Sequence, residues 1–191
     1  MVIINIVIGE EKDMIQLAKA FSELKDKKYN NSYITKIKLE QYGKRRNTPC
    51  HVIIEKETSR FLIISSNMYD DNDQMVAKLS MTLFLNVVVS NLNETSVIPK
   101  EVVPWKTFSK QEIYDFSKAV GDANTIHLTE KPVVQGLLIL KNIQESIKAF
   151  NTIEIKFTKP IYAGNPIYME SNGKNLTGYS NHVKVFQAVI K

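Results

Sequence analysis

The feature that most constrains this fold is a helix-length run with almost no polar side. In the 191-residue chain, Val133 to Leu140 is apolar apart from Gln135 and Gly136, and polar residues return from Lys141 onward. A helix that is apolar all round has to be buried all round. Pro132 fits the first position of such a helix, where a missing amide hydrogen costs nothing. The run therefore predicts a helix inside a domain core.

Strand-like segments follow this helix to the end of the chain. Their patterns predict three or four strands, at 152–159, 166–171, 175–179 and 182–190. Asn172-Gly173 is a turn signal typical of a β-hairpin between two of them. The expected architecture of this half is an antiparallel sheet wrapped around a buried helix. An exposed face or end of such a sheet favours dimerisation, so we expect a homodimer.

Another helix, with clear signals at both ends, is predicted just before the apolar run. Ser109 and Glu112 have the spacing of a capping box, which satisfies the first free amides of a helix. Gly121 suits the left-handed conformation that ends a helix. Residues 122–127 are therefore predicted to form a loop that leaves a well-terminated helix.

The first hundred residues are predicted to form a separate α+β unit. In chain order, its expected elements are a strand at 2–8, a helix from Met14 to Leu24, strands at 33–39, 51–56 and 60–65, and a second helix opened by Asp70 and Asp71 with Met75, Val76, Leu79 and Leu83 inward. Two prolines break any period within 92–104, which predicts a linker. We expect two domains, at 1–98 and 105–191, and an α+β class overall.

The loop at 122–127 gathers polar side chains between apolar segments. Asp122, Asn124 and His127 lie within six positions. A carboxylate beside an imidazole can hold a water and take or give its proton. Downstream, Gln135 and Gly136 begin the buried helix, whose first amides are unpaired and could polarise a carbonyl oxygen. The alternative is structural, because Gly-Asp-x-Asn is also a common turn composition and a histidine after a turn is usually structural or exposed.

Two segments of this half resemble a known family. FSKQEIYDFSKAVGDANTIHLTEKPVVQGLLI (108–139) and IEIKFTKPIYAGNPIYME (153–170) are similar to the signature of the MaoC-like hot-dog family, which includes R-specific enoyl-CoA hydratases. The resemblance covers about 105–191. It implies a hot-dog fold, an antiparallel sheet wrapped around a buried helix.

The resemblance also implies a reaction and its residues. Asp122 and His127 fall on the family's catalytic dyad, and the expected substrate-binding residues are Asn124, Gln135 and Gly136. The implied function is a hydro-lyase that adds water to trans-2-enoyl thioesters or removes it from 3-hydroxyacyl thioesters. The implied partner is an acyl-CoA or acyl-carrier-protein thioester. No metal or redox cofactor is needed, and the three histidines are too dispersed in sequence to suggest a metal site.

The sequence departs from the family pattern at three places. Thr125 replaces a usual proline, Gln135 stands where histidine is common, and the connection from His127 to Pro132 is short. A non-catalytic acyl-thioester-binding or assembly subunit is therefore kept as the alternative function. Thioester hydrolysis is a third option, but its candidate acid, Glu145, lies among polar neighbours. Residues 1–100 are either a degenerate second hot-dog or an unrelated α+β module.

Composition limits the partners and the compartment. The formal net charge is +5, which suits an anionic partner, but the charges are scattered and do not form a nucleic-acid footprint. Cys50 is the only cysteine, so no intramolecular disulfide is possible and a reducing cytosol fits best. The apolar start lacks the features of a signal peptide, and no apolar run is long enough to span a bilayer. We expect a cytoplasmic protein that binds neither membrane nor nucleic acid.

Overall fold

The strands within the described residues form one antiparallel sheet. The computed structural model describes residues 13–24, 29–43, 50–85, 102–147 and 149–191. Within them, nine strands pair in the order β2-β3-β4-β1-β6-β9-β8-β7-β5. The strands are β1 (Tyr33–Gln41), β2 (Cys50–Glu57), β3 (Phe61–Tyr69), β4 (Met75–Phe84), β5 (Val103–Thr107), β6 (Thr152–Phe157), β7 (Pro166–Asn172), β8 (Asn175–Ser180) and β9 (Val183–Ile190).

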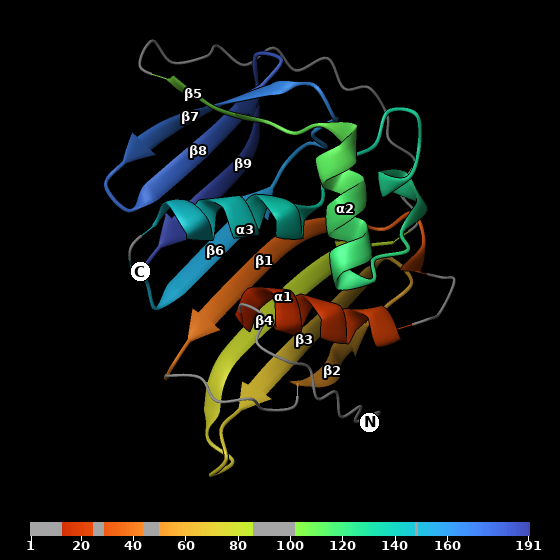
Figure 1. Ribbon diagram of the computed structural model, residues 1–191, viewed down its shortest axis with the longest axis vertical. Helices are drawn as coiled ribbons and strands as arrows, with labels where there is room; N and C mark the ends of the chain where they lie inside the picture. The colour runs from red at the N-terminus through yellow and green to blue at the C-terminus, as the bar shows by residue number, and fades with distance from the viewer. Residues whose placement is uncertain (1–12, 25–28, 44–49, 86–101, 148) are drawn as a thin grey trace.

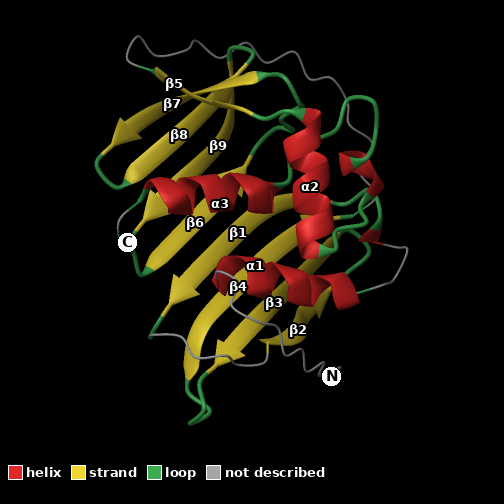
Figure 2. Cartoon of the chain, in the orientation of Figure 1, coloured by secondary structure: helices red, strands yellow, loops and turns green. Residues whose placement is uncertain are grey.

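Helices cover one face of this sheet (Figures 1 and 2). They are α1 (Asp13–Ala20), which continues into the 3₁₀ turn η1 (Phe21–Glu23), α2 (Lys110–Val120), the 3₁₀ turn η3 (Thr125–His127) and α3 (Gly136–Ser146). The segment Leu137–Leu140 of α3 is buried, as the apolar run predicted. None of the helices in the described ranges has the length and apolar character needed to span a bilayer.

The two halves of the chain repeat one connectivity. In the C-terminal half, α3 leads into β6, and β7, β8 and β9 then fold back so that β9 pairs with β6. In the N-terminal half, α1 leads into β1, and β2, β3 and β4 fold back so that β4 pairs with β1. This repetition is the arrangement that a degenerate second hot-dog predicts. The strand predicted at 2–8 lies outside the described residues.

The halves join through the pairing of β1 with β6. Ile37 lies opposite Ile155 in this antiparallel pair, and Leu39 lies opposite Ile153. All four side chains are fully buried. The hydrophobic core therefore crosses from one half to the other. The division at 98 and 105 stays a prediction, because 86–101 lie outside the described residues, but β5 begins at Val103, within the predicted linker.

The helix predicted after Asp70 is wrong, because this segment is β4. The Asp70 carboxylate accepts the amides of Asn72 and Gln74, which makes a turn and not a helix cap. The strand then alternates, with a buried series that consists of Ala77, Leu79, Met81 and Leu83. Leu79 and Leu83 fit a helical stripe as well, and pairing with both β1 and β3 decides in favour of the strand.

The helix ends around the predicted loop are largely as expected. Ser109 and Glu112 form the capping box, and Gly121 ends α2 with φ 68°. The predicted start of α3 at Pro132 is wrong, since α3 begins at Gly136. Pro132 instead accepts the amide of Ala163 through its carbonyl, and the following residue forms a β-bridge. Residues 132–134 are therefore extended when they approach α3.

The strands of the C-terminal half are confirmed. The structure has four strands, β6, β7, β8 and β9, where three or four were predicted, with small differences at their ends. The β7–β8 hairpin turns through Gly173 and Lys174, one residue later than the predicted Asn172-Gly173. Gly173 has φ 58°, a left-handed conformation that favours glycine.

Candidate active site

The predicted acid–base pair is brought together at the end of α2. Gly121 ends that helix, so Asp122 leaves it in a tight loop, and η3 then turns His127 back toward the carboxylate. The Nε2 atom of His127 lies 3.5 Å from Oδ2 of Asp122. His127 is buried and Asp122 is partly exposed. The two side chains converge as the sequence predicted.

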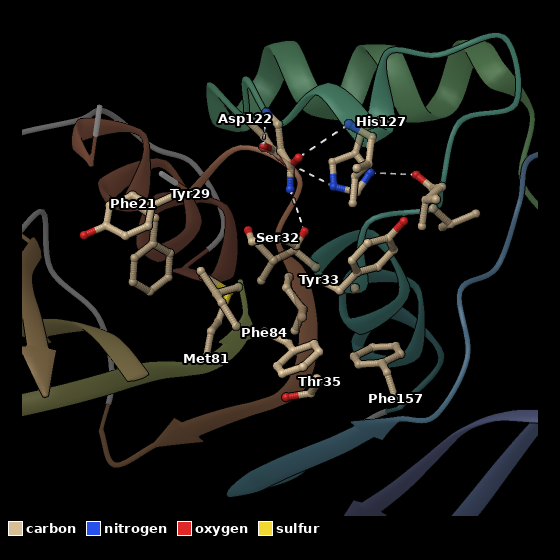
Figure 3. Close-up of a pocket in the computed structure, with 18 of the residues that line it drawn as sticks. Phe21, Tyr29, Ser32, Tyr33, Thr35, Met81, Phe84, Asp122, His127 and Phe157 are labelled. Atoms are coloured by element: carbon tan, nitrogen blue, oxygen red, sulfur yellow. Dashed lines mark hydrogen bonds and ion pairs between the residues drawn. The ribbon is translucent and has the colours of Figure 1, made fainter. Parts of the chain in front are cut away.

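Hydrogen bonds fix which atoms of the pair remain available. Nδ1 of His127 lies 2.7 Å from the carbonyl oxygen of Val133, which can only accept, so Nδ1 carries the proton of the neutral ring. Nε2 therefore has a lone pair that faces Asp122. The other carboxylate oxygen, Oδ1, accepts the amide of Asn124 at 3.0 Å. Oδ2 of Asp122 and Nε2 of His127 are therefore the two acceptor atoms that face each other (Figure 3).

Burial keeps this imidazole neutral. It lowers the pKa of His127 below 6.5, and the Asp122 charge and the Val133 carbonyl oppose that effect without cancelling it. A neutral imidazole and an ionised carboxylate are both acceptors, so they cannot bond each other directly. A single water that donates one hydrogen to each would satisfy both atoms.

The start of α3 supplies hydrogen-bond donors. The first amides of a helix have no acceptor within it. Among the residues that the structure describes, the amides of Gly136 and Leu137 have no hydrogen-bond acceptor. A Cβ atom at Gly136 would lie 3.0 Å from Phe157 and 3.1 Å from Ile37. Glycine therefore keeps this helix start close to the packed side chains around it.

The dyad and the helix start line one cavity of about 730 Å³. Figure 3 shows Asp122 and His127 at one end of the drawn cavity and Met81, Phe84 and Phe157 toward the other. The N-terminal half provides much of the wall, through the residues Phe21, Leu24, Tyr29, Tyr33, Ile34, Thr35, Ile64, Met81, Leu83 and Phe84. The site is therefore composite, with the polar pair from one half and a largely apolar wall from the other.

This contribution of the N-terminal half to the cavity was not predicted from the sequence. Tyr33, the first residue of β1, lines the cavity and directly follows Ser32, whose carbonyl accepts a hydrogen bond from the side chain of Asn124. Its burial raises the pKa of its phenol, which stays a neutral donor at physiological pH. The only sequence signal was an aromatic residue at the start of a predicted strand, and that is common in ordinary cores.

Asn124 is held by hydrogen bonds to the N-terminal half. Its Nδ2 donates to the carbonyl of Ser32 at 2.8 Å, and its Oδ1 accepts the amide of Asn31 at 3.0 Å. Asn124 also lines the cavity. Its predicted contact with substrate stays a prediction, but its hydrogen bonds show that it shapes the loop.

The side chain of Gln135 is directed at α2. Its Nε2 donates to the carbonyl of Ile113 at 3.0 Å and to Oγ of Ser117 at 2.7 Å. Gln135 is buried and is not among the residues that line the cavity. These bonds tie α3 to α2, and nothing in the geometry supports its predicted contact with substrate, which stays a prediction.

The remaining candidates lie elsewhere. Glu145 forms an ion pair with Lys141 at 3.0 Å on the outer part of α3 and does not line the cavity. Within the described residues, no group of three or more His, Cys, Asp or Glu side chains could hold a metal ion. Of the titratable residues proposed from the sequence, Asp122 and His127 are the two that line the cavity.

Comparisons with known proteins give matches only in structure. No protein-family model and no curated protein matches the sequence. HtdX from Mycobacterium tuberculosis is similar with a TM-score of 0.61 and 17% identity, over 85% of this chain and 77% of that one. A MaoC-like dehydratase from Phytophthora capsici is similar with a TM-score of 0.58 and 14% identity, over 84% of this chain and 69% of that one.

A protein of a different activity has the same architecture. An acyl-ACP thioesterase from Bacteroides thetaiotaomicron is similar with a TM-score of 0.63 and 9% identity, over 99% of this chain and 96% of that one. At such low identities these likenesses show the fold, which is the hot-dog fold that the sequence resemblance implied. They do not distinguish dehydration from hydrolysis.

Proposed function

We propose that the protein is a hydro-lyase that hydrates trans-2-enoyl thioesters or dehydrates 3-hydroxyacyl thioesters. One observation carries the proposal. Two acceptor atoms, Oδ2 of Asp122 and Nε2 of His127, lie 3.5 Å apart on the wall of a cavity that also contains the start of α3. Hydration needs a water held by a base, and the geometry supports that role.

The dyad positions and activates the water. In this proposal, a water donates one hydrogen to Asp122 and one to His127, so its oxygen lone pairs face the cavity. The oxygen attacks C3 of the enoyl thioester, and the C2–C3 π electrons shift toward the thioester oxygen. The dyad takes one proton from the water and returns a proton to C2. The product gains hydroxyl at C3 and hydrogen at C2, so one water is added in total.

The start of α3 stabilises the oxygen where charge develops. Gly136 and Leu137 line the same cavity, and their amides have no acceptor among the described residues. A thioester oxygen placed there gains negative charge in the transition state, and both the amides and the helix dipole favour that charge. These donors are fixed by the helix, so they need no reorganisation during the reaction.

The apolar wall from the N-terminal half suits an acyl chain. Ile64, Met81 and Leu83 are buried side chains on β3 and β4 that face the cavity. A chain that extends from the dyad toward them would bury apolar surface at about 25 cal/mol per Å². We propose that this half binds the acyl group, which gives a role to residues that the sequence left unexplained.

The thiol carrier of the substrate is proposed to be anionic. The chain has a formal net charge of +5, and Lys159 is a cation among the cavity-lining residues. Coenzyme A and the phosphopantetheine arm of a carrier protein both carry phosphate. Either thioester would supply negative charge to this basic protein, so both are used in the assay.

The predicted homodimer is kept as a proposal. β1 and β6 pair with each other within one chain, so they offer no free edge to a partner. The outer strands of the described sheet are β2 and β5, and a second copy could add at either edge. Sedimentation at several protein concentrations tests this, and a monomer at micromolar concentration would contradict it.

The test is one enoyl-thioester reaction with three readouts. Crotonyl-CoA and crotonyl-carrier protein are mixed with wild type, Asp122→Asn and the matched control Asp115→Asn, which changes an exposed carboxylate on α2. We expect loss of enoyl-thioester absorbance with wild type and Asp115→Asn, and a loss of about 100-fold or more in Asp122→Asn. Saturable binding without turnover would instead indicate the non-catalytic subunit, and release of free thiol would indicate hydrolysis.

A further inference from the structure

We propose that Asn31 is a positioning residue, which holds the catalytic loop in place through Asn124 and Thr125. Asn31 belongs to the N-terminal half, whereas the loop that carries Asp122 and His127 belongs to the C-terminal half. The proposal rests on the proposed function for its catalytic meaning. Its structural meaning, that the loop is held from the other half, can be tested without any activity.

Three hydrogen bonds join the two halves at this point. The amide of Asn31 donates to Oδ1 of Asn124 at 3.0 Å, and Nδ2 of Asn124 donates to the carbonyl of Ser32 at 2.8 Å. The hydroxyl of Thr125 donates to Oδ1 of Asn31 at 2.7 Å. These partners are 92 to 94 positions apart in the sequence. We call this set of four residues, Asn31, Ser32, Asn124 and Thr125, the clamp.

The clamp acts on the part of the loop that shapes the dyad. Asn124 donates its amide to Asp122 at 3.0 Å, and its carbonyl accepts the amide of His127 at 3.1 Å. Both dyad members are therefore bonded to Asn124, which belongs to the clamp. A shift of Asn124 moves the carboxylate and the imidazole together, and a displacement of about 1 Å is enough to impair a catalytic geometry.

The clamp also fixes the position of the loop relative to the apolar wall that the N-terminal half contributes to the cavity. Ser32 directly precedes Tyr33, Ile34 and Thr35, which line the cavity. Ser32 is buried, so this end of the clamp is fixed in the core. The distance between the water-binding pair and the acyl wall is therefore set at the clamp.

Asn31 has the backbone that this role requires. Its φ is 61°, in the left-handed region that asparagine and glycine tolerate better than other residues. In this conformation its amide reaches Asn124 while its side chain reaches Thr125. Glycine at position 31 would keep the backbone and the amide bond and would remove only the bond to Thr125.

Thr125 has a backbone that would accept proline. It is the first residue of η3, and 3₁₀ residues have φ near the value that a proline ring fixes. The preceding Asn124 is extended, with φ −65° and ψ 118°, as a residue before proline should be. The amide of Thr125 has no acceptor among the described residues, so proline would cost no backbone hydrogen bond. Proline could therefore stiffen the loop in place of the clamp's hydroxyl bond.

The clamp can be tested by variants that should lower kcat and by one that should restore it. Asn31→Gly and Thr125→Val each remove the same hydrogen bond from opposite ends, and Thr129→Val is the matched control, an exposed threonine in the neighbouring loop. We expect both variants to lower kcat by about fivefold with little change in KM. Adding Thr125→Pro to Asn31→Gly should restore kcat to within about twofold of wild type. Unchanged kcat in both single variants, or no rescue, would overturn the proposal.

A second readout does not depend on turnover. The imidazole signals of the three histidines are followed by NMR as a function of pH, with His127 assigned by its loss in His127→Gln. We expect His127 to titrate below 6.5 in wild type, closer to 6.5 in Asn31→Gly as the loop loosens, and again as in wild type after Thr125→Pro is added. If wild type hydrates nothing, the proposed function fails, and the titration still decides the clamp. If His127 titrates identically in wild type, Asn31→Gly and Thr125→Val, the clamp is refuted.

Discussion

Phe84 and Phe61 lie side by side on neighbouring strands with their ring centroids 4.9 Å apart, but only Phe84 lines the cavity. Phe61 is on the outside, with 44% of its surface exposed. The two rings are directly paired across β3 and β4, so each supports the other. Replacing either phenylalanine by alanine removes the same ring contact, but only the replacement of Phe84 changes the space that substrate would occupy.

Phe84 and Phe61 allow a matched test of whether the apolar wall of the cavity binds the acyl chain. Phe84→Ala should enlarge the cavity and raise kcat/KM for a long-chain enoyl-CoA relative to crotonyl-CoA by about tenfold, since each buried methylene is worth about 0.8 kcal/mol. Phe61→Ala should leave that ratio within about twofold of wild type. The measurement is kcat/KM across a series of chain lengths. Equal ratios in the two variants would show that the acyl chain does not reach β4.

Gly136→Ala tests the packing at the start of α3. The added Cβ would lie 3.0 Å from Phe157 and 3.1 Å from Ile37, which is closer than ordinary contact. We expect the free energy of unfolding to fall by about 1–3 kcal/mol because the site is overpacked. Urea denaturation measures this change. Gly43→Ala is the control, since its Cβ would meet Val76 at an ordinary 3.4 Å and should cost less than about 0.5 kcal/mol.

The buried histidine predicts a loss of stability in acid. Burial lowers the pKa of His127 below 6.5, so between the folded pKa and 6.5 the unfolded chain binds more protons than the folded one. The contribution of His127 to stability is therefore complete above pH 6.5 and is lost as the pH falls toward the folded pKa, at about 1.4 kcal/mol for each unit of pKa difference.

Unfolding measured between pH 7.5 and 5 tests this linkage. His127→Gln should show a shallower loss of stability over that range than wild type, because it lacks the proton-binding difference. His51→Gln, at a partly exposed histidine on β2, should retain the wild-type dependence. Parallel curves for wild type and His127→Gln would mean that the imidazole is not buried in the neutral form.

The same pKa predicts the acid limb of activity. Nε2 of His127 has to be unprotonated to accept from water, so the decline of kcat/KM in acid should be centred below pH 6.5. The Asp122 charge raises the pKa of His127, so removing that charge in Asp122→Asn should move the NMR titration of His127 to lower pH. A wild-type decline centred above pH 7 would contradict a neutral buried base.

Local signals made the C-terminal half predictable from sequence. The capping box at Ser109 and the glycine at position 121 each specify backbone geometry through their nearest neighbours. They fixed where α2 ends, and the loop that follows could then bring only a few side chains together. Asp122 and His127 were found for that reason, with added support from the family resemblance.

Long-range relationships were not predictable in the same way. In the segment of β4, Leu79 and Leu83 satisfy a helical period and a strand period equally, and only pairing with β1 and β3 decides between them. The cavity wall depends on that strand and on the β1–β6 pairing. The contact of Asn31 with Asn124 joins residues 93 positions apart, which no local pattern encodes.

A double-mutant cycle tests whether Asp122 and His127 act as one unit on one shared water. Values of kcat/KM for crotonyl-CoA are measured for wild type, Asp122→Asn, His127→Gln and the double variant. We expect the double variant to be no slower than the slower single variant, to within about threefold, because either change already disables the unit. Losses that multiply in the double variant would contradict it, since the two side chains would then act independently.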